Sequence, residues 1–192
     1  RNQIEKMVRL GVFHKDQKGC FYPWQLCGEG EFYRALKQLW SLPEGFTPWE
    51  KDRPLTRKRA AFMLYDGYVL RFGLEEKNKP PYMTDYNDIS ISPGDPNYDS
   101  NIPLGATIYY PLVPFEKLED MEELTKEEKT KVEAVYRLGL MRSEQHIRRG
   151  SLKNGRLFQP DLEVTREKAA KLLYFCFVLK QNVKKENHRI DD

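Results

Sequence analysis

Two distant stretches of the chain share one layout, and this repetition constrains the fold more than any other feature. Each stretch has a short stripe of apolar residues at helical spacing that ends in Leu-Gly, then a polar loop, then Phe-x-Pro, then a second predicted helix. The second helix starts seven residues after the phenylalanine in both. Helix-loop-helix units cannot bury their apolar faces alone, so they are expected to pack on one another. The elements lie at Leu10-Gly11, Phe21-Tyr22-Pro23 and Gly28, and again at Leu138-Gly139, Phe158-Gln159-Pro160 and Thr165.

The unit has a clear physical logic. A glycine after the first helix takes the left-handed conformation that other residues avoid. The proline of Phe-x-Pro keeps the residue before it extended, so the first helix cannot continue. In the last copy, Thr165 is predicted to cap the second helix and to place Arg166 at its first position, on the surface. Cys176 lies in the apolar run 172–178 and is predicted to be a buried free thiol.

A middle copy is indicated by the run from Pro54 through Thr56 and Arg57 to Leu64. The sequence therefore predicts a mainly α fold, in which the helices that start near Gly28, Thr56 and Thr165 pack around a shared axis. The expected divisions are 1–45 for the first repeat, 46–126 for a degenerate second repeat with a long irregular insertion, and 127–192 for the third repeat and a tail.

The motifs resemble those of the S-layer homology family: its Leu-Gly-Ile turn, its Phe-x-Pro loop and its Thr-Arg-Ala-Glu helix start. The resemblance is most specific over 132–140 and 158–170. It implies a three-lobed helical bundle on a bacterial cell surface or in the cell wall. It also implies that grooves between the lobes bind secondary cell-wall polysaccharide, which often carries a ketal-linked pyruvate.

The resemblance also nominates binding residues. The motif arginine suits a carboxylate because a guanidinium offers forked donors, and this nominates Arg57 and Arg166 as glycan-binding residues. Thr56 and Thr165 are the caps that position them. The alternative is that both arginines only solvate helix ends. If the grooves bind an anionic polysaccharide, replacement of Arg166 by alanine is expected to weaken that binding and to change the stability little.

No copy has the complete motif. The fourth motif position is Arg59 in the middle copy and Lys168 in the last copy, so neither can close a capping box with a glutamate. The first copy has Gly28 and Glu29 in place of threonine and arginine. With a glutamate at the arginine position, the first copy is expected to offer no carboxylate-binding site.

The pattern breaks between about Phe72 and Lys126, where turns and extended chain are predicted. The alternating oxygen donors over 95–101 are like half of a calcium loop, but Ser100 and Ala106 stand where glycine and a bidentate glutamate are needed, so no metal site is predicted. Asx turns explain the pattern better. Aromatic residues could stack on sugar rings, although a role in the core is the simpler interpretation: Phe46, Trp49, Tyr65, Tyr68, Tyr82, Tyr86, Tyr109 and Tyr110.

Other function classes are not favoured. The 32 basic and 29 acidic residues are mixed along the chain, which argues against nucleic acid as a partner. No apolar run is long enough for membrane insertion. No catalytic motif and no cofactor motif is present, so an enzyme is not predicted and no cofactor is expected. A bridge between Cys20 and Cys27 is conceivable, but free thiols are favoured.

Two functions remain open. The first is a surface-anchoring module that binds wall polysaccharide. The second is a structural module for protein interaction, with other surface-layer proteins as partners, that has kept the scaffold and lost glycan binding. The degenerate motifs and the insertion motivate the second.

Overall fold

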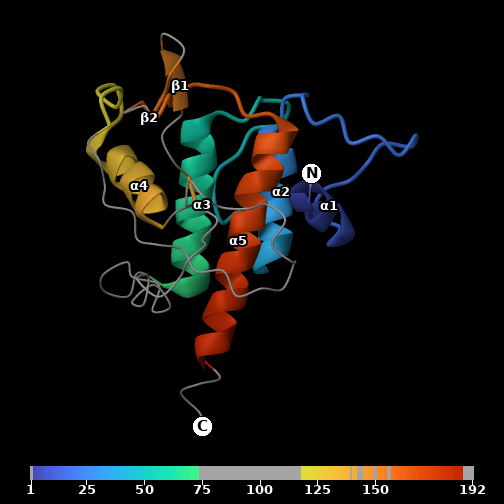
Figure 1. Cartoon of the computed structure of the whole chain (residues 1–192). Helices are drawn as coiled ribbons and strands as arrows, with labels where there is room; N and C mark the ends of the chain where they lie inside the picture. Colours follow the sequence, from blue (N-terminus) through green and yellow to red (C-terminus); the bar gives the residue numbers. More distant parts are fainter. Residues whose placement is uncertain are drawn as a thin grey trace.

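The described part of the computed structural model is mainly helical, as the sequence predicts, and comprises residues 2–73, 118–138, 140–141, 145–148, 151–154 and 157–187 (Figure 1). Between α4 and α5 the chain also forms a small antiparallel hairpin of two strands, β1 and β2. It occupies a stretch that the sequence predicts as a polar loop, because two four-residue strands carry too short a pattern to be recognised. The elements are α1 (Asn2–Arg9), α2 (Glu29–Trp40), α3 (Arg57–Phe72), α4 (Lys126–Arg137), β1 (Gln145–Arg148), β2 (Ser151–Asn154) and α5 (Arg166–Asn187).

The local signals act as expected at several helix ends. Gly11, two residues after α1, has a φ of 66°, the left-handed conformation predicted for it. Helix α4 opens with a complete capping box between Thr125 and Glu128, so the expected boundary between 126 and 127 falls within its first turn. None of the described helices is long and apolar enough to cross a membrane.

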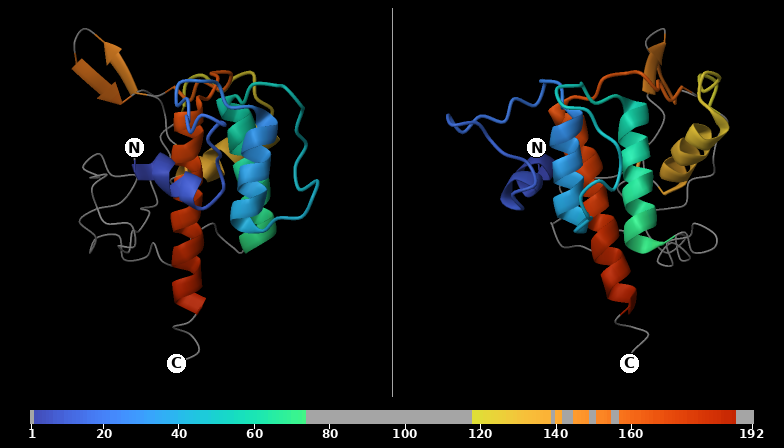
Figure 2. Two further views of the ribbon diagram at one scale, coloured as in Figure 1. Left: turned by 90° about the vertical axis from the view of Figure 1, so that its right-hand side faces the viewer. Right: turned by 180° about the vertical axis from the view of Figure 1, so that it is seen from behind.

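Helix α2 packs against both α3 and α5, and the three helices stand side by side along much of their length (Figure 2). Helix α1 packs on α5, and α4 packs on α3. The Trp40 indole at the end of α2 is fully buried and donates to the carbonyl of Cys176 in α5, at 3.0 Å. Gly67 of α3 gives Trp40 its room, because a methyl group there would lie 3.2 Å from the indole Cε3. The core therefore joins segments far apart in sequence.

The starts of α2, α3 and α5 meet in a closed ring of backbone hydrogen bonds. The donors and acceptors are the residues that directly precede the three N-caps: the amide of Cys27 donates to Val164 at 2.9 Å, Val164 to Leu55 at 2.8 Å, and Leu55 to Cys27 at 2.8 Å. Three short antiparallel bridges accompany the ring. The prediction that the helices starting near Gly28, Thr56 and Thr165 meet is confirmed.

The thiols should report this packing. Cys27 and Cys176 are buried and Cys20 is exposed, all three as free thiols. Burial raises the pKa of Cys176 well above its usual value, and burial followed by the nearby Glu31 carboxylate raises that of Cys27. We expect a thiol reagent to label one of the three cysteines rapidly in the native protein and all three after denaturation. Rapid native labelling of Cys176 would contradict the packing of α5.

Candidate functional site

Each of the three helix starts is covered by a loop that precedes a different helix. We call residues 21–27 the first loop, 49–55 the second loop and 158–164 the third loop. The first loop covers the start of α5, the second covers α2 and the third covers α3. The first amide of each helix donates to the covering loop at the same position: Arg166 to Gln25 at 2.8 Å, Glu29 to Arg53 at 2.9 Å, and Arg57 to Leu162 at 2.9 Å.

The two arginines nominated from the sequence, Arg57 and Arg166, each contact the loop that covers the start of their own helix. Arg57 is buried; its Nε donates to the carbonyl of Phe158 at 2.6 Å and its guanidinium lies 4.7 Å from the centre of that ring. Arg166 repeats this at the first loop, with its guanidinium 4.5 Å from the Phe21 ring and a hydrogen bond to the Phe21 carbonyl. A stacked, donating guanidinium clamps each loop to its helix.

Arg166 has further partners. It donates to the carbonyl of His14 at 2.8 Å and to the carboxylate of Glu31 at 3.1 Å. It is the first residue of α5, as predicted, but its side chain is only 12% exposed. The expected surface position of Arg166 is therefore wrong, because three segments converge on its guanidinium. With these contacts, removal of Arg166 is predicted to cost more stability than the sequence suggests.

Thr56 and Thr165 cap their helices as predicted. Each hydroxyl accepts at 3.4 Å from the amide three residues later, Arg59 and Lys168 respectively. The structure does not bring the four nominated residues into one site, since Arg57 faces the third loop and Arg166 faces the first.

Glu29 occupies the position of the two arginines at the start of α2. It is fully buried, and it accepts from the Arg59 guanidinium at 2.9 Å and from the backbone amide of Glu50 at 3.0 Å. Arg53 lies 3.8 Å from the same carboxylate. Two ion pairs link the second motif position of one helix to the fourth motif position of another. Arg166 of α5 pairs with Glu31 of α2, and Glu29 of α2 pairs with Arg59 of α3. The second pair thus has the first pair's geometry with the charges exchanged.

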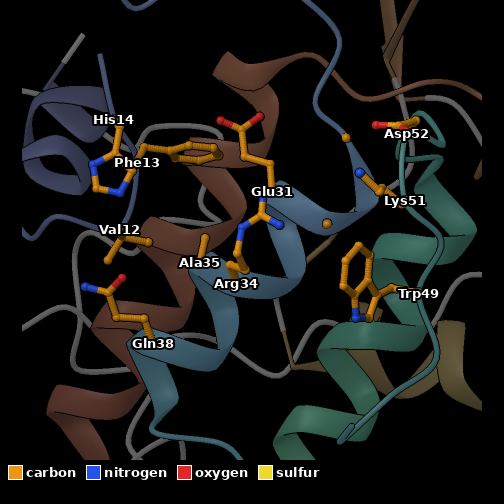
Figure 3. A pocket seen from close by; sticks show the side chains of 12 residues that line it. Val12, Phe13, His14, Glu31, Arg34, Ala35, Gln38, Trp49, Lys51 and Asp52 are labelled. Atoms are coloured by element: carbon orange, nitrogen blue, oxygen red, sulfur yellow. The ribbon is translucent and has the colours of Figure 1, made fainter. Parts of the chain in front are cut away.

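A groove of about 550 Å³ lies where the second loop meets α2, and Figure 3 shows its lining side chains. We call it the α2 groove. Arg34 stands between Glu31 on one side and Trp49 on the other (Figure 3). The lining residues are Val12, Phe13, His14, Gly28, Gly30, Glu31, Arg34, Ala35, Gln38, Trp49, Lys51 and Asp52.

At the groove, the start of α2 lacks hydrogen bonds that the corresponding backbone amides make at the other two helix starts. The second amide of α3, Lys58, donates to Pro160 at 2.8 Å, and that of α5, Glu167, donates to Pro23 at 3.0 Å. Within the described residues, the amides of Gly30 and Glu31 in α2 have no hydrogen-bond partner. Gly28 has no side chain that could cap them. Free amides at the start of a helix attract anions.

The charges around the groove favour an anion by a small excess. Across the described ranges, neither Arg34 nor Lys51 forms an ion pair. The charge of Glu31 is balanced by Arg166 at 3.0 Å. Asp52 on the rim is the remaining acid, so two unpaired cations face one unpaired carboxylate.

Trp49 forms the apolar wall. Its indole stacks on Tyr33 at 5.3 Å, and Tyr33 stacks on Phe46 at 4.8 Å, so both tryptophan and phenylalanine join the core as the simpler sequence interpretation has it. A methyl group on Gly30 would lie 2.6 Å from Cζ3 of Trp49, which is why α2 has glycine at this position. The indole is only partly buried and lines the groove.

Sequence reasoning missed the groove residues Arg34 and Lys51, and it gave Trp49 only as one of several aromatic residues that could stack on sugar rings. A usable signal was present, because Trp49 lies seven residues before Thr56, the spacing of Phe21 from Gly28 and of Phe158 from Thr165. Several predictions for the middle of the chain lie outside the described residues: the half calcium loop over 95–101, and the aromatic residues Tyr82, Tyr86, Tyr109 and Tyr110.

No protein-family model matches the chain, and no curated protein matches it.

Proposed function

We propose that the chain is a cell-surface anchoring module and that the α2 groove binds an anionic cell-wall polysaccharide. One observation carries the proposal: in one groove, two amides that have no hydrogen-bond partner among the described residues, those of Gly30 and Glu31, converge with Arg34 and Lys51, two cations without an ion pair in the same part of the chain. The three-lobed arrangement of repeats and the location outside a bacterial cell belong to the same proposal. Both rest on the resemblance of the motifs to the S-layer homology family.

The groove chemistry suits an acidic sugar better than a neutral one. A carboxylate such as that of a ketal-linked pyruvate would accept from the two amides, where the helix dipole also favours negative charge. Arg34 can add a forked donor, and Lys51 a point charge. The apolar face of a pyranose ring would lie against the indole of Trp49.

In this proposal, the arginines nominated from the sequence are not the main ligand-binding residues. The assignment of direct glycan contact to Arg57 and Arg166, with Thr56 and Thr165 as caps, stays a prediction. We propose that Arg166 acts as a positioning residue, because it holds Glu31 and the carbonyl of His14, both of which line the groove. The first copy, expected to lack a carboxylate site because of Glu29, becomes the proposed site because Arg59 and Arg53 offset that charge.

A protein-interaction module remains the second candidate. Trp24 of the first loop is 78% exposed, and Leu26 of the same loop is 47% exposed. Exposed aromatic and aliphatic side chains on an ordered loop are typical of protein contacts. This candidate places the partner on the first loop, away from Trp49 and Lys51.

Binding to purified bacterial wall sacculi separates the candidates. We expect the protein to sediment with sacculi, to lose binding once the attached polysaccharide is removed, and to lose it in the double variant Arg34→Ala/Lys51→Ala. A matched control, Arg9→Ala/Lys126→Ala, removes the same charges from exposed positions on α1 and α4. Equal sedimentation of the two double variants would exclude the groove, and loss on Trp24→Ala alone would favour the interaction module.

A threonine at position 28 should close part of the site. Gly28 has the extended backbone of Thr56, with φ −80° and ψ 151°, and a Cβ there meets only the Arg53 carbonyl at 3.9 Å. In Gly28→Thr, the hydroxyl can cap the Glu31 amide and withdraw it from the ligand. We expect the polysaccharide affinity to fall roughly tenfold, the worth of one charge-assisted hydrogen bond. The stability should change by only about 0.5 kcal/mol.

Isothermal calorimetry measures the affinity, and urea unfolding measures the stability. Gly28→Ala is the matched control, since it adds a Cβ without a hydroxyl and should bind as the wild type does. Equal affinity of Gly28→Thr and Gly28→Ala would show that the Glu31 amide takes no part in binding.

A further inference from the structure

The second loop carries a peptide unit that is turned over relative to the other two loops. In the first and third loops, the peptide after the phenylalanine presents its carbonyl to Arg166 and Arg57. At the same place in the second loop, the peptide between Trp49 and Glu50 presents its N–H to Glu29.

The backbone angles agree with this reversal. Tyr22 and Gln159, which follow the two phenylalanines, have left-handed φ values of 52° and 55°. Among the described residues with positive φ, Glu50 does not appear, whereas Asp52, two residues later, has a φ of 63°. Turning a peptide over changes the φ of its second residue by a half-turn, so the hydrogen bonds and the angles report the same difference.

The exchanged ion pair explains why the peptide turns. A guanidinium can only donate, so Arg57 and Arg166 select a carbonyl; an ionised carboxylate can only accept, so Glu29 selects an N–H. The buried carboxylate of Glu29 in turn requires the positive charge of Arg59. Glu29, Arg59 and the turned peptide therefore form one coupled feature.

The second loop also lacks a hydrogen bond that the other two loops accept from the second amide of the helix they cover. In the other two loops, the carbonyl two residues after the phenylalanine, at Pro23 and Pro160, accepts from the second amide of the helix. In the second loop that residue is Lys51, and its carbonyl accepts nothing from Gly30. We infer that the reversed pair Glu29 and Arg59 holds the second loop turned over and thereby keeps the α2 groove open.

Exchange of the two charges should close the groove. In Glu29→Arg/Arg59→Glu, the new arginine selects the Trp49 carbonyl, Glu50 takes the left-handed conformation, and the Lys51 carbonyl moves onto the Gly30 amide. Amide hydrogen exchange followed by NMR tests this without any ligand. In the wild type, Gly30 should exchange faster than Lys58 and Glu167, its counterparts in α3 and α5. In the exchanged variant, Gly30 should slow by at least about tenfold and approach them.

The control is Lys58→Asp/Asp161→Lys, which exchanges a second ion pair between a helix start and a loop, 2.6 Å apart and more exposed. It should leave the exchange of Gly30 unchanged. The inference is overturned if Gly30 is already as protected as Lys58 in the wild type, or if it stays fast in the exchanged variant. Failure of the exchanged variant to fold, while the control folds, would also overturn it, because the new pair would then not reproduce Arg166 with Glu31.

A second measurement, the binding of polysaccharide by the same variants, rests on the proposed function. Purified wall polysaccharide should bind the wild type and the Lys58→Asp/Asp161→Lys control, and should bind the closed variant at least about tenfold more weakly. If Gly30 becomes protected and the wild type binds no polysaccharide, the proposed function fails while Glu29 and Arg59 stay assigned as positioning residues. If the wild type binds and the closed variant binds equally well, the ligand does not use the opening.

Discussion

Replacement of Glu29 by alanine should lower the free energy of unfolding by about 3–5 kcal/mol, the usual cost of removing one partner of a buried ion pair. The carboxylate is fully buried and accepts from Arg59 and from the amide of Glu50. Its loss leaves a guanidinium that is only 20% exposed without its counter-charge. Urea unfolding monitored by circular dichroism measures the effect.

Two variants bracket that result. Glu44→Ala removes an exposed glutamate that pairs with Lys37 and should cost far less, because solvent screens an exposed ion pair. Glu29→Gln keeps an acceptor for the Glu50 amide and should fall between the two alanine variants. A loss in Glu29→Ala no larger than in Glu44→Ala would show that the buried pair does not hold the second loop.

Arg166→Ala should also destabilise the fold strongly, with a loss of about 3 kcal/mol in unfolding free energy, somewhat less than Glu29→Ala. The guanidinium donates to the carbonyls of Phe21 and His14 and to the carboxylate of Glu31. The Glu31 carboxylate would be left with the thiol of Cys27 at 3.6 Å.

Arg166→Lys separates charge from shape. A lysine keeps the positive charge near Glu31 but cannot reach three separate acceptors or stack as a flat group, so it should recover less than half of the loss. Thermal unfolding with calorimetry ranks the two variants. Full recovery by lysine would mean that the charge alone matters and that the clamp on Phe21 contributes nothing.

Features with a local cause could be predicted from the sequence. The helices follow from apolar spacing, the caps at Thr56 and Thr165 from their hydroxyls, and the left-handed Gly11 from its place after a helix. The burial of Cys176 follows from the apolar run around it. The packing of the three helices also followed from the sequence, because helices with one apolar face cannot be stable alone.

Features that depend on contacts between residues far apart in the chain could not be predicted from the sequence. Arg57 lies 101 residues from Phe158 along the chain, and Arg166 lies 135 residues from Glu31. Nothing near an arginine in the sequence distinguishes a guanidinium that faces solvent from one that clamps a remote loop. Glu29 and Arg59 each looked like a lost motif residue, and only their 2.9 Å contact shows them as a pair with exchanged charges.

The α2 groove is tested most directly by NMR titration with a pyruvylated fragment of wall polysaccharide. The amides of Gly30 and Glu31 and the indole N–H of Trp49 should shift and saturate together, while the Lys58 and Glu167 amides, hydrogen-bonded to Pro160 and Pro23, should not move. Arg34→Ala/Lys51→Ala should abolish the shifts. Shifts centred on Thr56 or Thr165, or none at millimolar fragment with a folded protein, would contradict a glycan site in the groove.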